Sequence, residues 1–86
     1  MTRRLDWAEY RYEEFGACDP MKTIAILPTA AIEQHGPHLP VGTDTLIAEG
    51  MLAELRRVVP EDLDIRILPV QAVGKSNEHL WAGGTL

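Results

Sequence analysis

The chain has 86 residues, of which 13 are acidic and 8 are basic, so its formal net charge is −5. This length allows one small domain, and 45% hydrophobic with 24% charged residues argues against disorder. Because there is no Lys/Arg cluster and no apolar run near the ~20 residues of a membrane span, we expect neither nucleic acid nor a membrane as partner. The single cysteine, Cys18, and the lack of a signal peptide predict a cytoplasmic protein.

The N-terminal segment predicts a short amphipathic helix over residues 5–15. Its apolar side chains recur among charged ones at helical spacing and are Leu5, Trp7, Ala8, Tyr12 and Phe15. Asp6, followed by Glu9 three positions later, predicts a capping box at the start of this helix. A turn at residues 16–20 then leads into the next element.

The middle of the chain predicts a strand, a helix and a second strand. Residues 23–27 form an almost unbroken apolar run that Pro28 stops, which favours a strand covered on both faces. From Asp44 or Thr45 to Val59 the apolar residues follow a helical period, and Pro60 ends the helix. Residues 65–70 predict the second strand, so the three elements form a βαβ unit of a parallel sheet. Such sheets need cover on both faces, so we expect a part outside this chain to complete the fold.

The loop between the first strand and the helix carries most of the candidate ligands. It is far longer than the roughly two to six residues usual for such loops, and it leaves the carboxyl end of a strand, where α/β sheets bind ligands. Glu33 and His35 lie one residue apart, which places both on one face of an extended segment, and Asp44 returns at the helix start. One imidazole and two carboxylates suit zinc, manganese or iron(II), and a carboxylate can bridge two ions.

Each of these residues also has a structural explanation. Asp44 can serve as the N-cap of the helix, Glu33 as a solvated carboxylate, and His35 and His38 as hydrogen-bonded loop residues. Their grouping on one long loop at a strand end favours a metal site.

A second polar cluster, residues 76–79, follows the second strand as the first cluster follows the first strand. Because neighbouring parallel strands deliver their loops to one sheet edge, both clusters are expected to line one pocket, although a polar surface loop is the alternative. Trp81 is predicted either as an apolar wall of that pocket or as a buried gap filler. The rest of residues 74–86 predicts a loop. Cys18 has no basic neighbour in sequence and is given no catalytic role.

One long motif and one shorter block carry a resemblance to a known family. The motif is Glu33-Gln34-His35-Gly36-Pro37-His38-Leu39-Pro40 followed by Thr43-Asp44. The block contains Gly74, Ser76, Glu78-His79 and Gly84-Thr85-Leu86, and Leu5 and Trp7 add support. These residues resemble the creatininase family of metal-dependent amidohydrolases. Family members are considerably longer, so the chain resembles their N-terminal portion.

The resemblance implies a three-layer α/β/α fold with a mostly parallel sheet. Residues 1–86 would supply an N-terminal helix and the βαβ unit of one creatininase-like domain, with the remainder of the domain on another polypeptide or fragment. It further implies a homo-oligomer, often a hexamer. Since some ligands and catalytic groups would lie in that remainder, we expect the isolated 86-residue chain to be inactive.

The resemblance also implies a centre of two divalent ions, zinc or manganese, with iron as a further option. Glu33, His35 and Asp44 match the metal positions, and Asp44 matches the carboxylate that bridges both ions. Glu78 and His79 match a block near the pocket that contacts the substrate or hydrogen-bonds to the ligands.

His38 is a weaker candidate of the same kind. Two departures from the family pattern, Thr29-Ala30-Ala31 and Ala82-Gly83 after Trp81, lie close to the expected pocket. The implied reaction is hydrolysis of a cyclic amide or related carbonyl compound by water activated at the two-metal centre. The departures leave open the ring opening of a cyclic inosose-type (cyclitol) ketone. A non-catalytic structural or interaction remnant is the alternative from another class.

Overall fold

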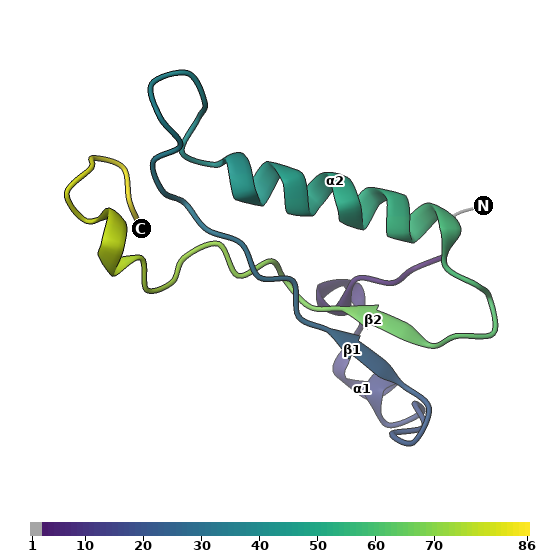
Figure 1. Cartoon of the computed structure of the whole chain (residues 1–86). Coiled ribbons are helices and arrows are strands. Elements are labelled where there is room, and N and C mark those ends of the chain that lie inside the picture. Colours follow the sequence, from purple (N-terminus) through teal and green to yellow (C-terminus); the bar gives the residue numbers. More distant parts are fainter. Residues whose placement is uncertain (1–2) are drawn as a thin grey trace.

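The computed structural model describes residues 3–86 and shows a two-stranded parallel sheet crossed by one long helix (Figure 1). In chain order the elements are the 3₁₀ turn η1 (Trp7–Glu9), α1 (Tyr12–Phe15), β1 (Ile24–Ile26), α2 (Thr43–Val58), β2 (Ile65–Ile67) and the 3₁₀ turn η2 (Asn77–His79). The strand, helix and strand of the predicted βαβ unit are therefore present, as expected for the α/β class. Within residues 3–86, no helix has the length and apolarity needed to cross a membrane.

The prediction of a single helix over residues 5–15 is wrong. The segment forms η1 and α1, two short turns separated by extended backbone at Tyr10 and Arg11. Asp6 makes no capping hydrogen bond; its carboxylate accepts hydrogen bonds from Arg56 of α2 at 2.6 and 3.1 Å instead. The break also lets the Tyr10 ring stack on the guanidinium of Arg66, 4.4 Å from the ring centroid. Contacts with distant residues thus override the local helical pattern.

The sheet pairs β1 and β2 in parallel, with Ile24 opposite Ile65 and Ile26 opposite Ile67. Both strands are shorter than predicted, and β1 is followed by Pro28, which has no N–H to give to the ladder. Pairing resumes beyond them, where Thr29 and Gln71 form an isolated bridge. The segments that follow the two strands therefore run side by side away from the sheet (Figure 1).

The expected cover on both faces is found for β2 and not for β1. All three residues of β2 are buried: Ile65 and Ile67 contact the core below α2, and Arg66 points the other way, toward Tyr10 and Phe15. In β1, Ile24 is 45% exposed, so residues 3–86 do not bury this strand on both sides. The edge of β1 opposite β2 has no strand beside it among residues 3–86.

The helix α2 begins one residue earlier than the sequence predicts and ends just before Pro60, as predicted. Its apolar side is only partly covered. Leu52 is buried with Leu5, Ile65 and Ile67, whereas Met51 is 70% exposed. The radius of gyration is 16.0 Å, compared with about 12 Å for a compact chain of this length. The small core and the elongated shape have one cause, since α2 extends well past the two strands (Figure 1).

Candidate metal centre

The loop of residues 27–42 is closed at its base by hydrogen bonds. The backbone N–H of Glu33 donates to the carbonyl of Val41 at 3.0 Å, and the hydroxyl of Thr43 donates to the carbonyl of Pro40 at 2.6 Å. Gly36 adopts a φ of +75°, a backbone conformation that residues other than glycine disfavour. The closed base holds Glu33 and the start of α2 next to each other.

Three predicted metal ligands meet at this base. Glu33, His35 and Asp44 each offer one ligand atom, and these atoms all lie within 4.8 Å of one another. Asp44 is in the first turn of α2, where the helix dipole favours a carboxylate, but the N-cap is Gly42, so the alternative of Asp44 as N-cap is wrong. All three residues are half-buried. The spacing argument for one face of an extended segment therefore holds.

The two ring nitrogens of His35 both face oxygen acceptors. Its Nδ1 lies 3.1 Å from the carbonyl oxygen of Glu33, which only accepts, so Nδ1 carries the proton. In the neutral ring Nε2 then has a lone pair, yet it lies 3.1 Å from Asp44 Oδ1, which is another acceptor. Two acceptor atoms at this distance are stable next to each other only with a cation between them.

A proton on Nε2 is one such cation. The pKa of His35 is raised by the hydrogen bond to the Glu33 carbonyl and, against some desolvation, by the charge of Asp44. A divalent ion fits the same pair of atoms. With bonds of about 2.05 Å, two ligand atoms lie about 2.9 Å apart at a right angle and about 3.4 Å apart at a tetrahedral angle. The observed 3.1 Å lies between these values. The donor set thus suits a bound metal.

The second predicted cluster reaches the same place from the other strand. Glu33, Glu78 and His79 form another group whose ligand atoms lie within 4.8 Å of one another. His79 Nε2 is 3.2 Å from Glu33 Oε2 and 3.9 Å from Glu78 Oε1. The hydroxyl of Thr85 donates to the His79 carbonyl at 2.9 Å and so helps to hold η2 in place. The structure thus brings the two clusters together.

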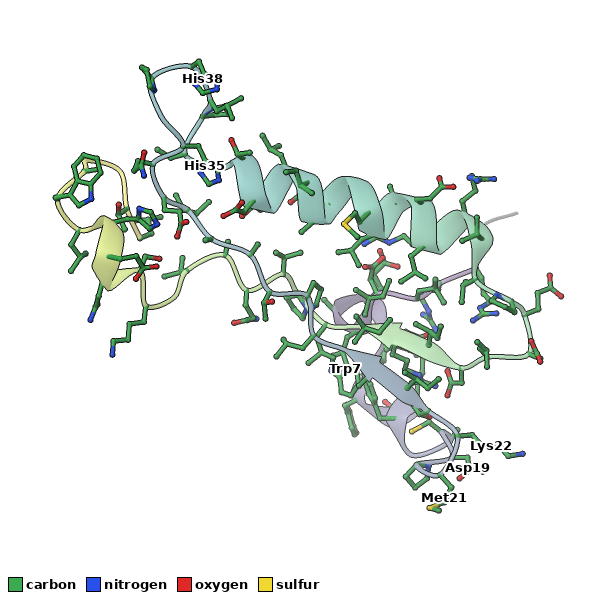
Figure 2. All side chains as sticks on the ribbon, in the orientation of Figure 1. Trp7, Asp19, Met21, Lys22, His35 and His38 are labelled. Carbon is green, nitrogen blue, oxygen red and sulfur yellow. The ribbon has the colours of Figure 1, made fainter. Side chains whose placement is uncertain are left out.

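His38 does not join either group of ligand atoms. Figure 2 shows it at the tip of the loop, while His35 lies at the base beside the start of α2. A Cβ at Gly36 would come within 3.3 Å of the His38 ring, so this ring rests over Gly36. Trp81 is 78% exposed, which contradicts the alternative of a buried gap filler. Its indole N–H donates to the carbonyl of Glu78 at 3.1 Å.

An open cavity of about 410 Å³ lies beside Asp44. It is lined by Thr29, Ala30, Ala31, Asp44, Ile47, Ala48 and Met51. One of the two departures from the family pattern, Thr29-Ala30-Ala31, therefore lies next to Asp44, as expected. Its small side chains leave the space open.

Gln34 is the residue of the site that the sequence interpretation left without a role. Its amide contacts both Gly36 and His79. The only signal in the sequence for a role of Gln34 is its place between Glu33 and His35. In an extended segment its side chain points to the opposite side from those of its two neighbours.

The family model described as creatinine amidohydrolase, or creatininase, matches residues 8–86. The chain belongs to the creatininase family. Among curated relatives of this creatininase-family chain, the mycofactocin precursor peptide peptidase of Mycolicibacterium smegmatis is 38% identical over 68 residues, which are 77% of this chain and 28% of the relative.

The protein of the same name from Mycobacterium tuberculosis is 40% identical over 67 residues, 71% of this chain and 27% of the relative. The chain thus spans little more than a quarter of the length of these relatives. No solved structure matches it significantly.

Proposed function

We propose that this creatininase-family chain forms part of the active site of a metal-dependent hydrolase that cleaves an amide bond. The observation that carries the proposal is the convergence of Glu33, His35 and Asp44 at the carboxyl end of β1, with His35 Nε2 and Asp44 Oδ1 3.1 Å apart. The family match supports it, because the resemblance predicts metal ligands at these three positions.

Glu33, His35 and Asp44 would hold the metal, and Asp44, at the start of α2, would serve as the carboxylate shared by two divalent ions, zinc or manganese. Ions in such a centre polarise a carbonyl and lower the pKa of water. The chain orients its own ligands: the carbonyl of Glu33 fixes the ring of His35, and the closed loop base fixes Glu33. Since three protein donors do not fill two coordination spheres, the proposal includes further ligands from the remainder of a three-layer α/β/α domain.

The cavity beside Asp44 is assigned to the substrate. Its volume of about 410 Å³ lies in the range of roughly 300–1,000 Å³ usual for small-molecule sites, and its lining is mainly small and apolar. Both named relatives are peptide peptidases, which favours a peptide or cyclic amide over a cyclitol ketone as substrate. A substrate panel that scores C–N against C–C cleavage in the assembled enzyme separates these classes.

The substitution Asp44→Asn tests the metal site itself. It removes one charge and one ligand with almost no change of shape, so Mn²⁺ or Zn²⁺ affinity should fall by more than the about 10- to 100-fold typical for groups that only support a ligand. Calorimetric titration measures it, and Glu49→Gln, an exposed carboxylate of the same helix, is the matched control. A folded wild type that binds no divalent ion would favour the non-catalytic remnant, and equal affinity in Asp44→Asn would refute the ligand assignment.

A further inference from the structure

The amide of Gln34 fixes which nitrogen of His79 carries the proton. The backbone N–H of Gly36 donates to Gln34 Oε1 at 2.9 Å, so the amide oxygen faces Gly36. The NH₂ group therefore faces the other way, and its Nε2 lies 3.2 Å from His79 Nδ1. Because an NH₂ group only donates, Nδ1 must accept. A neutral His79 ring then has its proton on Nε2.

Glu33 is the carboxylate nearest to that Nε2–H. Nε2 lies 3.2 Å from Glu33 Oε2, whereas Glu78 Oε1 lies 3.9 Å away, beyond hydrogen-bond distance. The side chains of His79 and Glu33 are 23% and 18% exposed, and that of Glu78 is 72% exposed. This contact thus lies where solvent is partly excluded. It involves one oxygen of Glu33, and the other oxygen remains for a metal.

The hydrogen bond between Gln34 and His79 Nδ1 also argues against His79 as a metal ligand. A second ion held by Glu33, Glu78 and His79 would need the lone pair of Nε2, and the proton of the neutral ring would then lie on Nδ1. An Nδ1–H would face the NH₂ group of Gln34, which cannot accept it. His35 differs at Nδ1, which faces the carbonyl of Glu33 and therefore carries a proton, while its Nε2 lies 3.1 Å from Asp44 Oδ1.

We propose that Gln34 and His79 are positioning residues, which hold the Glu33 carboxylate for the metal through the chain Gly36 N–H, Gln34 amide, His79 imidazole and Glu33 Oε2. In their neutral forms, His35 and His79 then carry the proton on different nitrogens, and they have different roles. His35 binds the ion through Nε2, and His79 donates from Nε2 to a ligand. The role in metal binding rests on the proposed function, but the tautomers do not.

The first experiment measures the tautomers in the metal-free chain. Long-range ¹H–¹⁵N correlation spectra of the histidine rings, recorded at about pH 8 where free imidazole is neutral, report which nitrogen carries the proton. We expect the proton of His79 on Nε2. In Gln34→Glu a carboxylate oxygen replaces the NH₂ group, so Nδ1 of His79 should gain a proton. Gln71→Glu, the same change at an exposed glutamine, is the control. A proton on Nδ1 in the wild type, or no response to Gln34→Glu, overturns the proposal.

The second experiment measures Mn²⁺ and Zn²⁺ affinity. His79→Ala removes the donor to Glu33 and should weaken binding about 10- to 100-fold, as is usual for partners that orient a ligand. His79→Gln places an amide N–H near the position of Nε2 and should restore most of the affinity, which neither a ligand histidine nor a merely structural one would allow. His38→Gln is the matched control outside the cluster. Wild-type affinity in His79→Ala, or a His79→Gln as weak as His79→Ala, refutes the assignment.

The two experiments keep the two proposals apart. If the wild type binds neither ion but the His79 proton lies on Nε2 and responds to Gln34→Glu, the proposed function fails and the hydrogen-bonded chain stands. If the ions bind and the tautomer is the opposite one, the positioning role fails and the metal site stands.

Discussion

Leu52→Ala is expected to destabilise the chain far more than Met51→Ala, although the two residues are neighbours on the predicted apolar side of α2. Leu52 is 8% exposed and packs with Leu5 and Ile67, while Met51 is 70% exposed. Leucine and methionine have similar helix propensities, both close to that of alanine. The difference between the two variants therefore measures burial and not helix formation.

The size of the effect follows from the packing of Leu52. Leucine-to-alanine changes in protein cores cost about 2.7–5.0 kcal/mol, the larger values belonging to sites that leave a larger cavity. Leu52 lies at the border of a core with only four buried apolar side chains among residues 3–86, so we expect about 2–3 kcal/mol. A chain of this length has a total free energy of unfolding of about 4–13 kcal/mol. Met51→Ala should stay within about 0.5 kcal/mol.

Urea unfolding followed by far-UV circular dichroism measures both variants. With an m-value of about 1–2 kcal/mol per molar urea, Leu52→Ala should lower the midpoint by at least about 1 M and leave the slope unchanged. Met51→Ala should hardly move it. An equal loss in both variants would refute the reasoning, because Met51 would then be buried in solution against a surface that residues 3–86 do not provide.

Two smaller predictions concern ion pairs away from the metal centre. Asp6→Asn weakens the pair with Arg56, whose side chains are 31% and 36% exposed, so the free energy of unfolding should fall by about 0.2–1 kcal/mol and less at high salt; a salt-independent loss above about 2 kcal/mol contradicts this. The Thr23 hydroxyl, 2.6 Å from Asp64, and then Arg66 lower the pKa of that carboxyl. Its contribution to stability is present above about pH 4 and is lost as the pH falls through the lowered pKa. Thr23→Val should make the loss of stability at acid pH smaller, as measured by urea unfolding at several pH values. An unchanged pH dependence of the free energy of unfolding would refute the coupling.

The elements of the βαβ unit could be predicted from the sequence because their signals are local. The period of apolar residues and the position of Pro60 locate α2 to within one residue at each end. The strand signals are equally local, but both strands are shorter than these signals predict. Residues 5–15 show the limit of such signals, since Asp6 and Tyr10 are held by Arg56 and Arg66, which lie far along the chain.

The candidate site divides in the same way. Residue types and their spacing were enough to group Glu33, His35 and Asp44, because all three lie on one loop and the helix that follows it. The part of Gln34 was not predictable, because its partner His79 comes from the loop after the other strand. His38 was a weaker candidate from the sequence, and the closed loop separates it from Glu33, His35 and Asp44.

The sequence by itself determined the family, the α/β character and the three metal-ligand candidates. Each depends on residue identity and short-range spacing. Only the tertiary structure decided which nitrogen of His35 and of His79 faces a carboxylate. It also decided which side of α2 is covered and that Asp6 pairs with Arg56. These depend on the directions of hydrogen bonds and on contacts between segments that the parallel pairing of β1 and β2 brings together.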